Sequence, residues 1–380
     1  MMLELTQEQQ DFAGAVADFC RREAGTREQR DRLTDYGRTP HSEAIAARIA
    51  ELGWAGIRVP EEYGGAGGSH VDMCILLEQT SRGMLPVGGM GPTLIVGGAY
   101  DRFGSPEQKE AVLRGIARGE SQSISMSEPA AGSDVGALTC RAERTAYGWR
   151  INGQKTWCSN AHFAKHILLV ARTSRDGGKH EGITMFHVPA GTPGLEVRGI
   201  ETMGGKEVND LYFTDCELPE DAVIGEVGQG WGQLMTGLNT ERLILGAMMT
   251  GTAQRAFDDC LAFITTREQF GRPVGSFQAL RHRMADLATE IEATRLLVYA
   301  VARMADAEPD RVLAREASMA KLKATETAKR MAIEGMQMMG GYGYATEFDM
   351  ERHVRTTIVS TVYGGTNEIQ RDIIGKTYGL

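Results

Sequence analysis

The sequence predicts an α+β fold, with helices at both ends of the chain and strands between them. Apolar residues recur at helical spacing up to about residue 120 and again, more strongly, from residue 229. Between these stretches, short strand-like runs are separated by glycine, asparagine and proline. Segregated helices and strands are typical of α+β proteins, whereas a Rossmann nucleotide site requires them to alternate. We therefore expect three domains, at residues 1–120, 121–228 and 229–380.

The first of these domains is expected to be helical. Helix-like spacing covers residues 5–22, 42–52 and 71–82. A further helix should begin near Ser105 and Pro106. A serine at the N-cap accepts a hydrogen bond from a free backbone N–H, and a proline in the first turn has no N–H to leave unpaired.

The middle domain is expected to be a small β sandwich or barrel. Strand-like runs cover residues 149–151, 166–171, 183–188 and 210–213, with turn residues between them. After residue 229 the helical pattern returns. One face of a long helix there is marked by apolar side chains at Phe277, Leu280, Met284, Leu287 and Ile291.

Composition excludes several classes of protein. The 380 residues carry a formal net charge of −9 with no basic tract, so nucleic acid is not an expected partner. The six cysteines contain no CxxC pair, which disfavours a disulfide framework or a zinc site and fits a reducing cytoplasm. The N-terminus does not match a signal or transit peptide, and no apolar run approaches the ~20 residues of a membrane span.

Four segments carry most of the functional information, although each also has a purely structural explanation. A polar turn, a core tryptophan at a strand end, a glycine C-cap and a turn entering a helix would account for them singly. They are MSEPAAGSD (126–134), KTWCSNA (155–161), QMMGGYGY (337–344) and YGGTNEIQ (363–370), and REQFG (267–271) and FQ (277–278) lie between the second and the third.

In this order and at these spacings, the segments resemble the acyl-CoA dehydrogenase family over essentially the whole chain. The resemblance implies an N-terminal helical domain, a middle β domain and a C-terminal four-helix bundle. It implies FAD as cofactor, acyl-CoA as substrate and an electron-transferring flavoprotein as electron acceptor. It also implies a homo-oligomer, a tetramer or at least a dimer, that acts in fatty acid or amino acid catabolism.

The resemblance also implies roles for individual residues. Those expected around the flavin ring are Met126, Ser127, Trp157 and Ser159, and Ser133 should touch the cofactor site and the acyl-CoA. Those expected at the diphosphate and adenosine, partly across a subunit interface, are Arg267, Phe270, Phe277, Gln278, Gln337, Met338, Met339, Gly340 and Gly341. Thr366 and Glu368 should also lie on the FAD. The chemistry agrees: an indole face excludes water from a ring, and glycines let backbone N–H groups approach a diphosphate.

The catalytic base departs from the common family pattern. Many members place a glutamate directly after the tyrosine of the fourth segment, where this chain has Gly364. The long-chain and isovaleryl types instead place it before an arginine on the first helix of the C-terminal domain, where this chain has Glu241 and Arg242. The resemblance therefore implies Glu241 as base.

The pattern around Glu241 points the same way. Glu241 interrupts an apolar stripe formed by Leu234, Leu238, Leu245 and Met248. Burial in such a stripe should raise the pKa of the carboxyl group, which suits a general base. The structural alternative is a glutamate at the edge of the stripe, paired with Arg242 or Arg255.

Other residues complete the expected site. The family stabilises the developing enolate with a flavin ribityl hydroxyl and the backbone N–H after the tyrosine, here that of Gly364. Asn239 and Arg242 should lie near the substrate. A second departure is Thr356, which stands where the family has an aspartate; we expect a local change in packing only.

The expected reaction is dehydrogenation of an acyl-CoA to the trans-2-enoyl-CoA. Alternatives on the same fold are an oxidase or monooxygenase, an enzyme that acts on acyl-carrier-protein thioesters, and the enoyl-reductase direction. A non-catalytic FAD protein that binds DNA is disfavoured, because it would require a basic extra domain. The sequence does not specify acyl chain length or branching.

Overall fold

A computed structural model describes residues 4–380, apart from the side chain of Leu238. The described chain forms two compact units. One, here called the helical unit, contains the residues up to Arg32, Ser69–Leu85 and Asn239–Leu380. The other, the sheet unit, contains Leu33–Gly68 and Pro86–Leu238. The two units are not divided at residues 120 and 228, where the sequence places the domain boundaries. Those boundaries stay a prediction.

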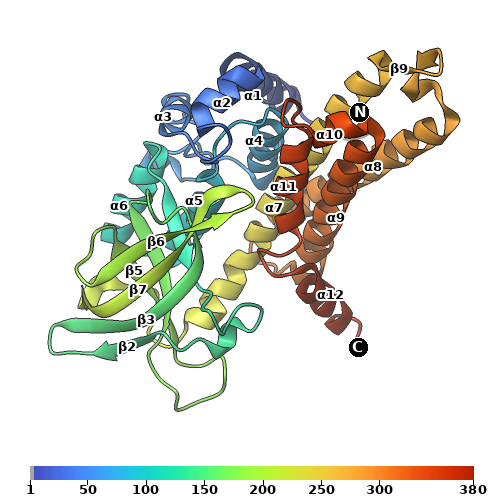
Figure 1. Cartoon of the computed structure of the whole chain (residues 1–380). Helices are drawn as coiled ribbons and strands as arrows, with labels where there is room; N and C mark the ends of the chain where they lie inside the picture. The colour runs from blue at the N-terminus through green and yellow to red at the C-terminus, as the bar shows by residue number, and fades with distance from the viewer. Residues whose placement is uncertain (1–3) are drawn as a thin grey trace. The chain divides into compact units, whose positions relative to one another are not determined.

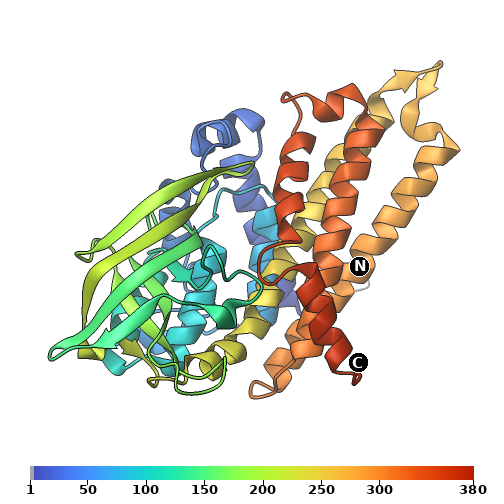
Figure 2. The ribbon, with the colours of Figure 1, turned by 60° about the horizontal axis from the view of Figure 1, so that its bottom comes forward.

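The helical unit is built around long helices from the C-terminal part of the chain. Helix α9 contacts α8, α10, α11 and α12, and α1 packs on α4, which in turn contacts α8 (Figure 2). The helices are α1 (Gln7–Ala24), α2 (Arg27–Thr34) up to Arg32, α4 (His70–Arg82), α7 (Gly230–Thr266) from Asn239, α8 (Gln278–Ala307), α9 (Ala314–Met339), α10 (Gly341–Tyr344), α11 (Met350–Ser360) and α12 (Asn367–Lys376). A short hairpin of β9 (Glu268–Gln269) and β10 (Arg272–Pro273) and a 3₁₀ turn, Val274–Ser276, join α7 to α8.

The sheet unit holds eight strands in one hydrogen-bonded sheet (Figure 1). The order is β6-β7-β3-β2-β4-β5-β8, with β1 paired to β4. The strands are β1 (Gln122–Ser125), β2 (Arg141–Arg144), β3 (Gly148–Ser159), β4 (His166–Arg172), β5 (Ile183–Pro189), β6 (Leu195–Thr202), β7 (Gly205–Pro219) and β8 (Val223–Ile224). The helices are α3 (Glu43–Glu51), α5 (Met90–Phe103) and α6 (Pro106–Ala117), with 3₁₀ turns at Glu61–Tyr63, Val135–Ala137 and Glu220–Ala222.

Two hydrophobic cores stabilise the sheet unit. Trp149, Phe186 and Phe213 belong to a core formed almost entirely by strand residues, so the sheet curls around it as the expected small barrel would. The edge strands β6 and β8 are not neighbours in the sheet, and the barrel is therefore not closed by hydrogen bonds between them. Tyr100 and Val112, from α5 and α6, belong to a second core on the sheet.

The predicted helix starts are confirmed. The Ser105 side chain accepts from the Gln108 backbone N–H, Gln108 returns the contact in a capping box, and Pro106 is the first residue of α6. Ser42 caps α3 by accepting from the Ile45 backbone N–H. Helix α5 was not predicted, because its glycines weaken the helical pattern; burial of Leu94, Val96 and Tyr100 stabilises it instead.

Candidate functional site

The predicted site residues fall into three groups, one in the sheet unit and two in the helical unit. In the sheet unit, the Thr156 backbone N–H donates to the Ser127 carbonyl at 2.9 Å, which joins the first two segments. Strand β3 shifts register between Lys155 and Cys158. Trp157 lies at this bulge with φ +59°, in the left-handed region that non-glycine residues rarely adopt, and 59% of its surface is exposed. Strain of this kind is often retained at functional sites.

A buried ion pair holds this group in place. Lys155 Nζ donates to the Met126 carbonyl at 2.8 Å and to Glu128 Oε1 at 2.9 Å. The Glu128 carboxylate also accepts from the backbone N–H groups of Thr139 and Cys140. Burial opposes ionisation of Glu128, but the Lys155 ammonium and these donors more than offset it and lower the pKa of the carboxyl group. Sequence analysis did not identify this pair.

The exposed surface of this group fits an aromatic cofactor. Ser127 and Ser159 are partly exposed, and their hydroxyl groups form no hydrogen bond with any residue that the structure describes. Together with the exposed indole of Trp157, they offer one apolar face and two hydrogen-bonding groups. Met126 is also partly exposed, and Ser133 is exposed on the following loop.

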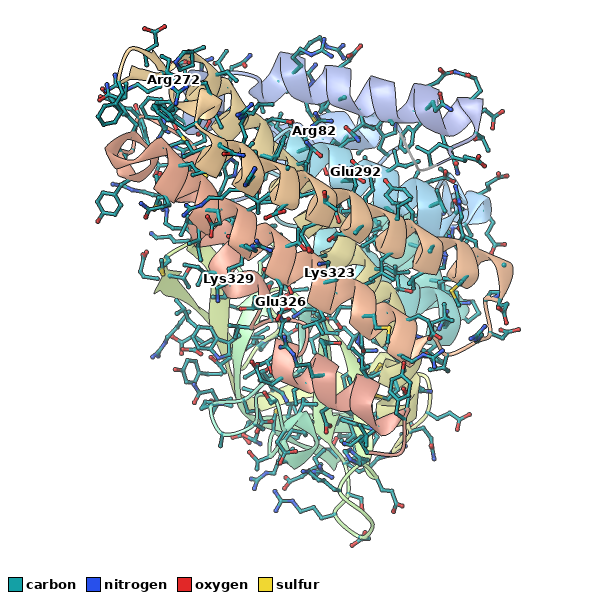
Figure 3. The ribbon with its side chains drawn as sticks, turned by 90° about the vertical axis from the view of Figure 1, so that its right-hand side faces the viewer. Arg82, Arg272, Glu292, Lys323, Glu326 and Lys329 are labelled. Carbon is teal, nitrogen blue, oxygen red and sulfur yellow. The ribbon has the colours of Figure 1, made fainter. Side chains whose placement is uncertain are left out.

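The second group lies where α7 ends and α8 begins. Phe270 is 94% exposed at the tip of the hairpin, with φ +53°, and its ring meets Phe277 edge to face. The Arg267 guanidinium lies 5.1 Å from the Tyr342 ring centroid. The neighbouring Arg272, at the same end of the unit, is labelled in Figure 3.

The glycine segment of this group also has a conformation that requires glycine. Gly340 has φ +62° and ψ −142°, which only glycine adopts readily, and its sequence neighbours Gln337 and Gly341 are exposed, as is Gln278 at the start of α8. Met338 and Met339 are buried, so their side chains belong to the core of the unit. Any contact that these two methionines make with a ligand would therefore involve their backbone.

The third group contains the expected base. A Cβ atom built on Gly364 would lie 3.5 Å from Glu241 Oε1, so the carboxylate on α7 reaches the place from which a side chain at residue 364 would start. The same Cβ atom would lie 2.3 Å from Leu245 Cδ1, and Gly364 has φ +61°. Both facts favour glycine at this position.

The surroundings of Glu241 contradict the alternative that this glutamate is paired with Arg242 or Arg255. Its carboxylate forms no hydrogen bond or ion pair with any other residue that the structure describes, because Arg255 pairs with Asp259 and Arg242 Nη1 donates to Asn239 Oδ1. Burial raises the pKa of Glu241, while Arg242 and Lys321 act in the opposite direction. Glu241 nevertheless keeps intermediate exposure, as a group that faces a ligand must.

The apolar stripe around Glu241 is partly confirmed. Leu234 and Leu245 are buried and Met248 is partly buried, whereas the Leu238 side chain lies outside the described residues. The Nε atom of Arg242 is buried and has no hydrogen-bond partner among the described residues.

The turn at Gly364 and Gly365 is held through its carbonyl groups and not through its N–H groups. Gln370 Nε2 donates to the carbonyl oxygens of Gly364 and Gly365 at 3.0 Å each. Lys321 Nζ also donates to Gly365 O at 3.0 Å. The backbone N–H groups of Gly364 and Gly365 have no partner among the described residues. Thr366 caps α12 by accepting from the Ile369 backbone N–H, and Glu368 is exposed in the first turn of that helix.

Sequence analysis missed the polar residues beneath this turn. Lys321, Thr325, Asn367 and Gln370 are buried there and hydrogen-bonded to one another or to the turn. One clue was available, because Lys321 is the one charged residue on a face of α9 that is otherwise formed by small residues, four of them alanine. Those positions, Ala317, Ala320, Ala324 and Ala328, are all buried.

Comparison with known proteins shows which family the chain belongs to. Models of the acyl-CoA dehydrogenase N-terminal, middle and C-terminal domains match residues 6–120, 123–216 and 228–379. Mitochondrial isovaleryl-CoA dehydrogenase of Solanum tuberosum is 34% identical over 375 residues, which are 97% of this chain and 90% of that protein. The chain belongs to the acyl-CoA dehydrogenase family. It is an enzyme with that family's fold, as its sequence predicts.

Other known proteins are also similar to this chain in structure or sequence. The crystal structure of an acyl-CoA dehydrogenase from Geobacillus kaustophilus superposes with a TM-score of 0.92 at 30% identity and covers 99% of each chain. The prolyl acyl carrier protein oxidase AnaB gives 0.92 at 27% identity, covering 99% of this chain and 100% of that one. Subunit CarC of the caffeyl-CoA reductase–Etf complex of Acetobacterium woodii is 32% identical over 363 residues, 94% of each chain.

Two further features concern the described residues as a whole. None of their helices is both long enough and apolar enough to cross a membrane. They also contain no group of three or more histidine, cysteine, aspartate or glutamate side chains placed to hold a metal ion.

Proposed function

We propose that this member of the acyl-CoA dehydrogenase family converts an acyl-CoA thioester to its trans-2-enoyl-CoA, with Glu241 as the base. The observation that carries the proposal is the meeting of Glu241 and Gly364. An unpaired carboxylate with a raised pKa lies 3.5 Å from the position of a Cβ atom on Gly364, where many family members carry their glutamate. One acid thus replaces the other at the same place.

The residues around this carboxylate have separate tasks. Glu241 accepts the proton from the substrate α-carbon, since a buried carboxylate is a stronger base than an exposed one. The free N–H of Gly364 donates to the thioester oxygen, where negative charge develops. Arg242 and Asn239, which contact each other on α7, orient the substrate.

FAD is the cofactor, and it supplies the hydride acceptor for the β-hydrogen. The residues present fit it: Trp157 offers an exposed aromatic face, and Ser127 and Ser159 offer free hydroxyl groups. These side chains would bind the ring, exclude water from it and donate hydrogen bonds to it.

We propose that the active form is a dimer or tetramer. Glu241 and Arg267 are separated by most of the length of α7, about 39 Å at ~1.5 Å per residue. FAD is too short to reach from a flavin near Glu241 to the Arg267 group of the same chain. The exposed Phe270 and Gln337 would therefore contact the FAD of another subunit.

We further propose an electron-transferring flavoprotein as electron acceptor and the cytoplasm as location. CarC, one of the relatives, is named as part of a complex with such a flavoprotein. All six cysteines are buried and free, which suits a reducing compartment. Fatty acid or amino acid catabolism would be the setting.

A second candidate uses the same site differently. The names of two similar proteins indicate a carrier-protein substrate in one case and the enoyl-CoA reductase direction in the other. A screen of acyl-CoAs, acyl-carrier-protein thioesters and enoyl-CoAs with dye donors and acceptors distinguishes these from the main proposal.

The base assignment is tested by replacing Glu241 with glutamine. Glu241→Gln keeps size and hydrogen-bonding capacity but removes basicity, so flavin bleaching in a single anaerobic turnover should slow by ~10²–10⁴-fold. FAD content should not change. The matched control is Glu326→Gln, an exposed glutamate on α9 that pairs with Arg371 and should bleach at the wild-type rate. Unchanged bleaching by Glu241→Gln would show that Glu241 is only structural.

A further inference from the structure

A lysine of the helical unit is completely buried beneath the turn that carries Gly364. Lys321 on α9 has 0% of its surface exposed, and its Nζ atom donates to Gly365 O and to Asn367 Oδ1, at 3.0 Å each. Burial of an ammonium group is costly unless it is hydrogen-bonded and balanced by negative charge. The position therefore requires a reason beyond packing, for which an apolar residue would suffice.

The hydrogen bonds of Lys321 determine how the turn is held. Asn367, the first residue of α12, accepts from both Lys321 and the Thr325 hydroxyl through Oδ1. The carbonyl groups of Gly364 and Gly365 are bound from α9 and α12, by Lys321 and Gln370. Because these carbonyl oxygens are fixed, the peptide groups that join Gly364 to Gly365 and Gly365 to Thr366 cannot rotate freely, which holds the backbone on the C-terminal side of Gly364. The N–H of Gly364 has no partner among the described residues.

The charge of Lys321 also acts on Glu241. Two charged groups influence that carboxylate, Arg242 from α7 itself and Lys321 from α9, and both favour its ionised form. Lys321 in turn is influenced by Glu241, by Glu368 on α12 and by Arg242. Burial lowers the pKa of Lys321 to about 8, so the group is still mostly protonated at neutral pH.

The two groups are near each other without being paired. No lysine or arginine nitrogen of the described residues forms an ion pair with Glu241, so its carboxylate stays available to substrate. A cation at this separation stabilises the carboxylate through the low-dielectric interior without occupying its oxygens. A directly bonded cation would instead compete with the proton that the base must accept.

We propose that Lys321 is a positioning residue for proton abstraction, which holds the Gly364–Gly365 turn from beneath and supplies positive charge that keeps Glu241 ionised. The proposal rests on the proposed role of Glu241. In the step, the α-carbon–hydrogen bond breaks, an O–H bond forms on Glu241, and the electron pair stays on the substrate as the enolate. Lys321 keeps its own proton throughout.

The test measures how bleaching depends on pH in wild type and in Lys321→Met. Bleaching requires ionised Glu241, so its rate rises with pH through the pKa of that group. Removing the cation should raise the midpoint of this rise by about one pH unit and slow bleaching below the midpoint by ~10-fold. Infrared titration of the Glu241 carboxyl group, identified by its absence in Glu241→Gln, should show the same shift without substrate.

Two further variants separate charge, geometry and general damage. Lys321→Arg keeps the charge but not the fit beneath the turn, so its midpoint should stay near that of wild type while its maximal rate falls. Lys323→Met removes a lysine two positions along α9, labelled in Figure 3, that pairs with Glu290 at the surface. It should match wild type in midpoint, rate and FAD content.

The outcomes distinguish this proposal from the one on which it rests. If Glu241→Gln is slow but Lys321→Met keeps the wild-type midpoint and rate, the Lys321 proposal is overturned and the base assignment stands. If Glu241→Gln bleaches normally, the base assignment itself fails. Should Lys321→Met not fold, Lys321→Gln carries the same expectation, since it is uncharged but retains a donor, and an unshifted infrared titration would overturn the proposal.

Discussion

Glu241 and Gly364 are far apart in sequence, but the fold places the Glu241 carboxylate beside the position that a Cβ atom on Gly364 would occupy. The glycine has a backbone conformation in which a side chain is strained, and Leu245 occupies the space that its Cβ atom would need. Glu241 approaches the same point from α7. The substitution of the usual glutamate by glycine and the presence of an acid on α7 are therefore two parts of one arrangement.

The raised pKa of Glu241 predicts a dependence of stability on pH. Burial makes the folded protein bind the proton of Glu241 more tightly than the unfolded chain does. The resulting stabilisation is fully present below the unfolded pKa, about 4.3, and is lost as pH rises through the folded pKa. Glu241→Gln cannot ionise, so at pH 7 it should unfold at a higher temperature than wild type, and the difference should vanish near pH 4.

Thermal unfolding of both proteins between pH 4 and pH 8 tests this expectation. The gain at pH 7 should amount to ~1.4 kcal/mol for each unit by which the pKa is raised. A Glu241→Gln protein that is less stable than wild type at pH 7 would mean that the ionised carboxylate contributes to folding. In that case burial would not be the dominant influence on the pKa of Glu241.

Restoring a glutamate at residue 364 should require a second change. In Glu241→Gln/Gly364→Glu, the new Cβ atom would lie 2.3 Å from Leu245 Cδ1, and the backbone has φ +61°. We expect this double variant to bleach as slowly as Glu241→Gln. Adding Leu245→Ala makes room and should recover part of the activity, with the remaining deficit reflecting imperfect placement, for which ~1 Å can cost ~10²-fold.

The measurement is single-turnover bleaching by the double and triple variants. Leu245→Ala alone is the control, because it removes buried apolar contacts without adding an acid. Equal rates for the double and triple variants would show that Leu245 is not what excludes a side chain at residue 364.

At the scale of residues, the sequence is most informative where one residue breaks a pattern. Glu241 interrupts an apolar stripe that is partly buried, and its proposed role follows from the family resemblance together with Gly364. Asn367 gave no such indication, because its hydrogen-bond partners Lys321 and Thr325 lie on a helix more than 40 positions away. Gln370 gave none either, because its bonds to the turn depend on the conformation of Gly364 and Gly365. Thr356, where the family has an aspartate, is exposed on α11, and the preceding Arg355 pairs with Glu351, which agrees with a change confined to packing.

At the scale of elements, the Lys155–Glu128 pair joins the loop after β1 to strand β3. It sets Met126 and Ser127 beside the bulge that exposes Trp157. The sequence predicted strands here but not their bulge, because register depends on pairing with β7 rather than on local residues. Helix starts were easier to predict, since a cap such as Ser105 is local.

Removal of one member of this pair should therefore affect both stability and flavin binding. Lys155→Met leaves the buried Glu128 carboxylate without its cation, and breaking a buried ion pair by removing one partner typically costs ~3–5 kcal/mol. We expect lower FAD content and a lower unfolding temperature. The matched control is Lys206→Met, an exposed lysine in β7, which should change neither.

The double variant Lys155→Met/Glu128→Gln decides whether the uncompensated charge is responsible. It removes both charges and should recover much of the lost stability. If it is no more stable than Lys155→Met, the loss comes from hydrogen bonds to the Met126 carbonyl and the Thr139 region rather than from charge.

At the scale of the whole molecule, the grouping of segments into compact units was not predictable from the sequence, because segments that are far apart in sequence belong to the same unit. Residues 4–32 belong with the C-terminal helices, and ion pairs of Arg30 with Asp349 and of Arg352 with Asp31 connect them. Nothing local in α2 indicates these partners. Order along the chain predicted the fold class correctly, whereas the assignment of segments to compact units required long-range contacts.

The exposed aromatic group at the end of α7 leads to the last prediction, which concerns assembly. Phe270 is 94% exposed although it is a large apolar side chain held in a left-handed conformation. In an isolated chain, replacing it should cost little stability, because it buries almost nothing there. If it contacts the FAD of a neighbouring subunit, Phe270→Ala should lower FAD retention and shift the protein towards smaller oligomers.

Sedimentation and flavin content of wild type and Phe270→Ala, measured over a range of protein concentrations, test this expectation. Tyr147→Ala is the matched control, an aromatic residue 92% exposed in the sheet unit, outside every predicted site. Phe270→Ala should lose FAD progressively on dilution while its Glu241 site stays intact, so bleaching should be normal in the fraction that retains cofactor. A Phe270→Ala protein with wild-type oligomeric state and FAD content would contradict the shared cofactor site, because Phe270 would then contribute neither to subunit association nor to FAD binding.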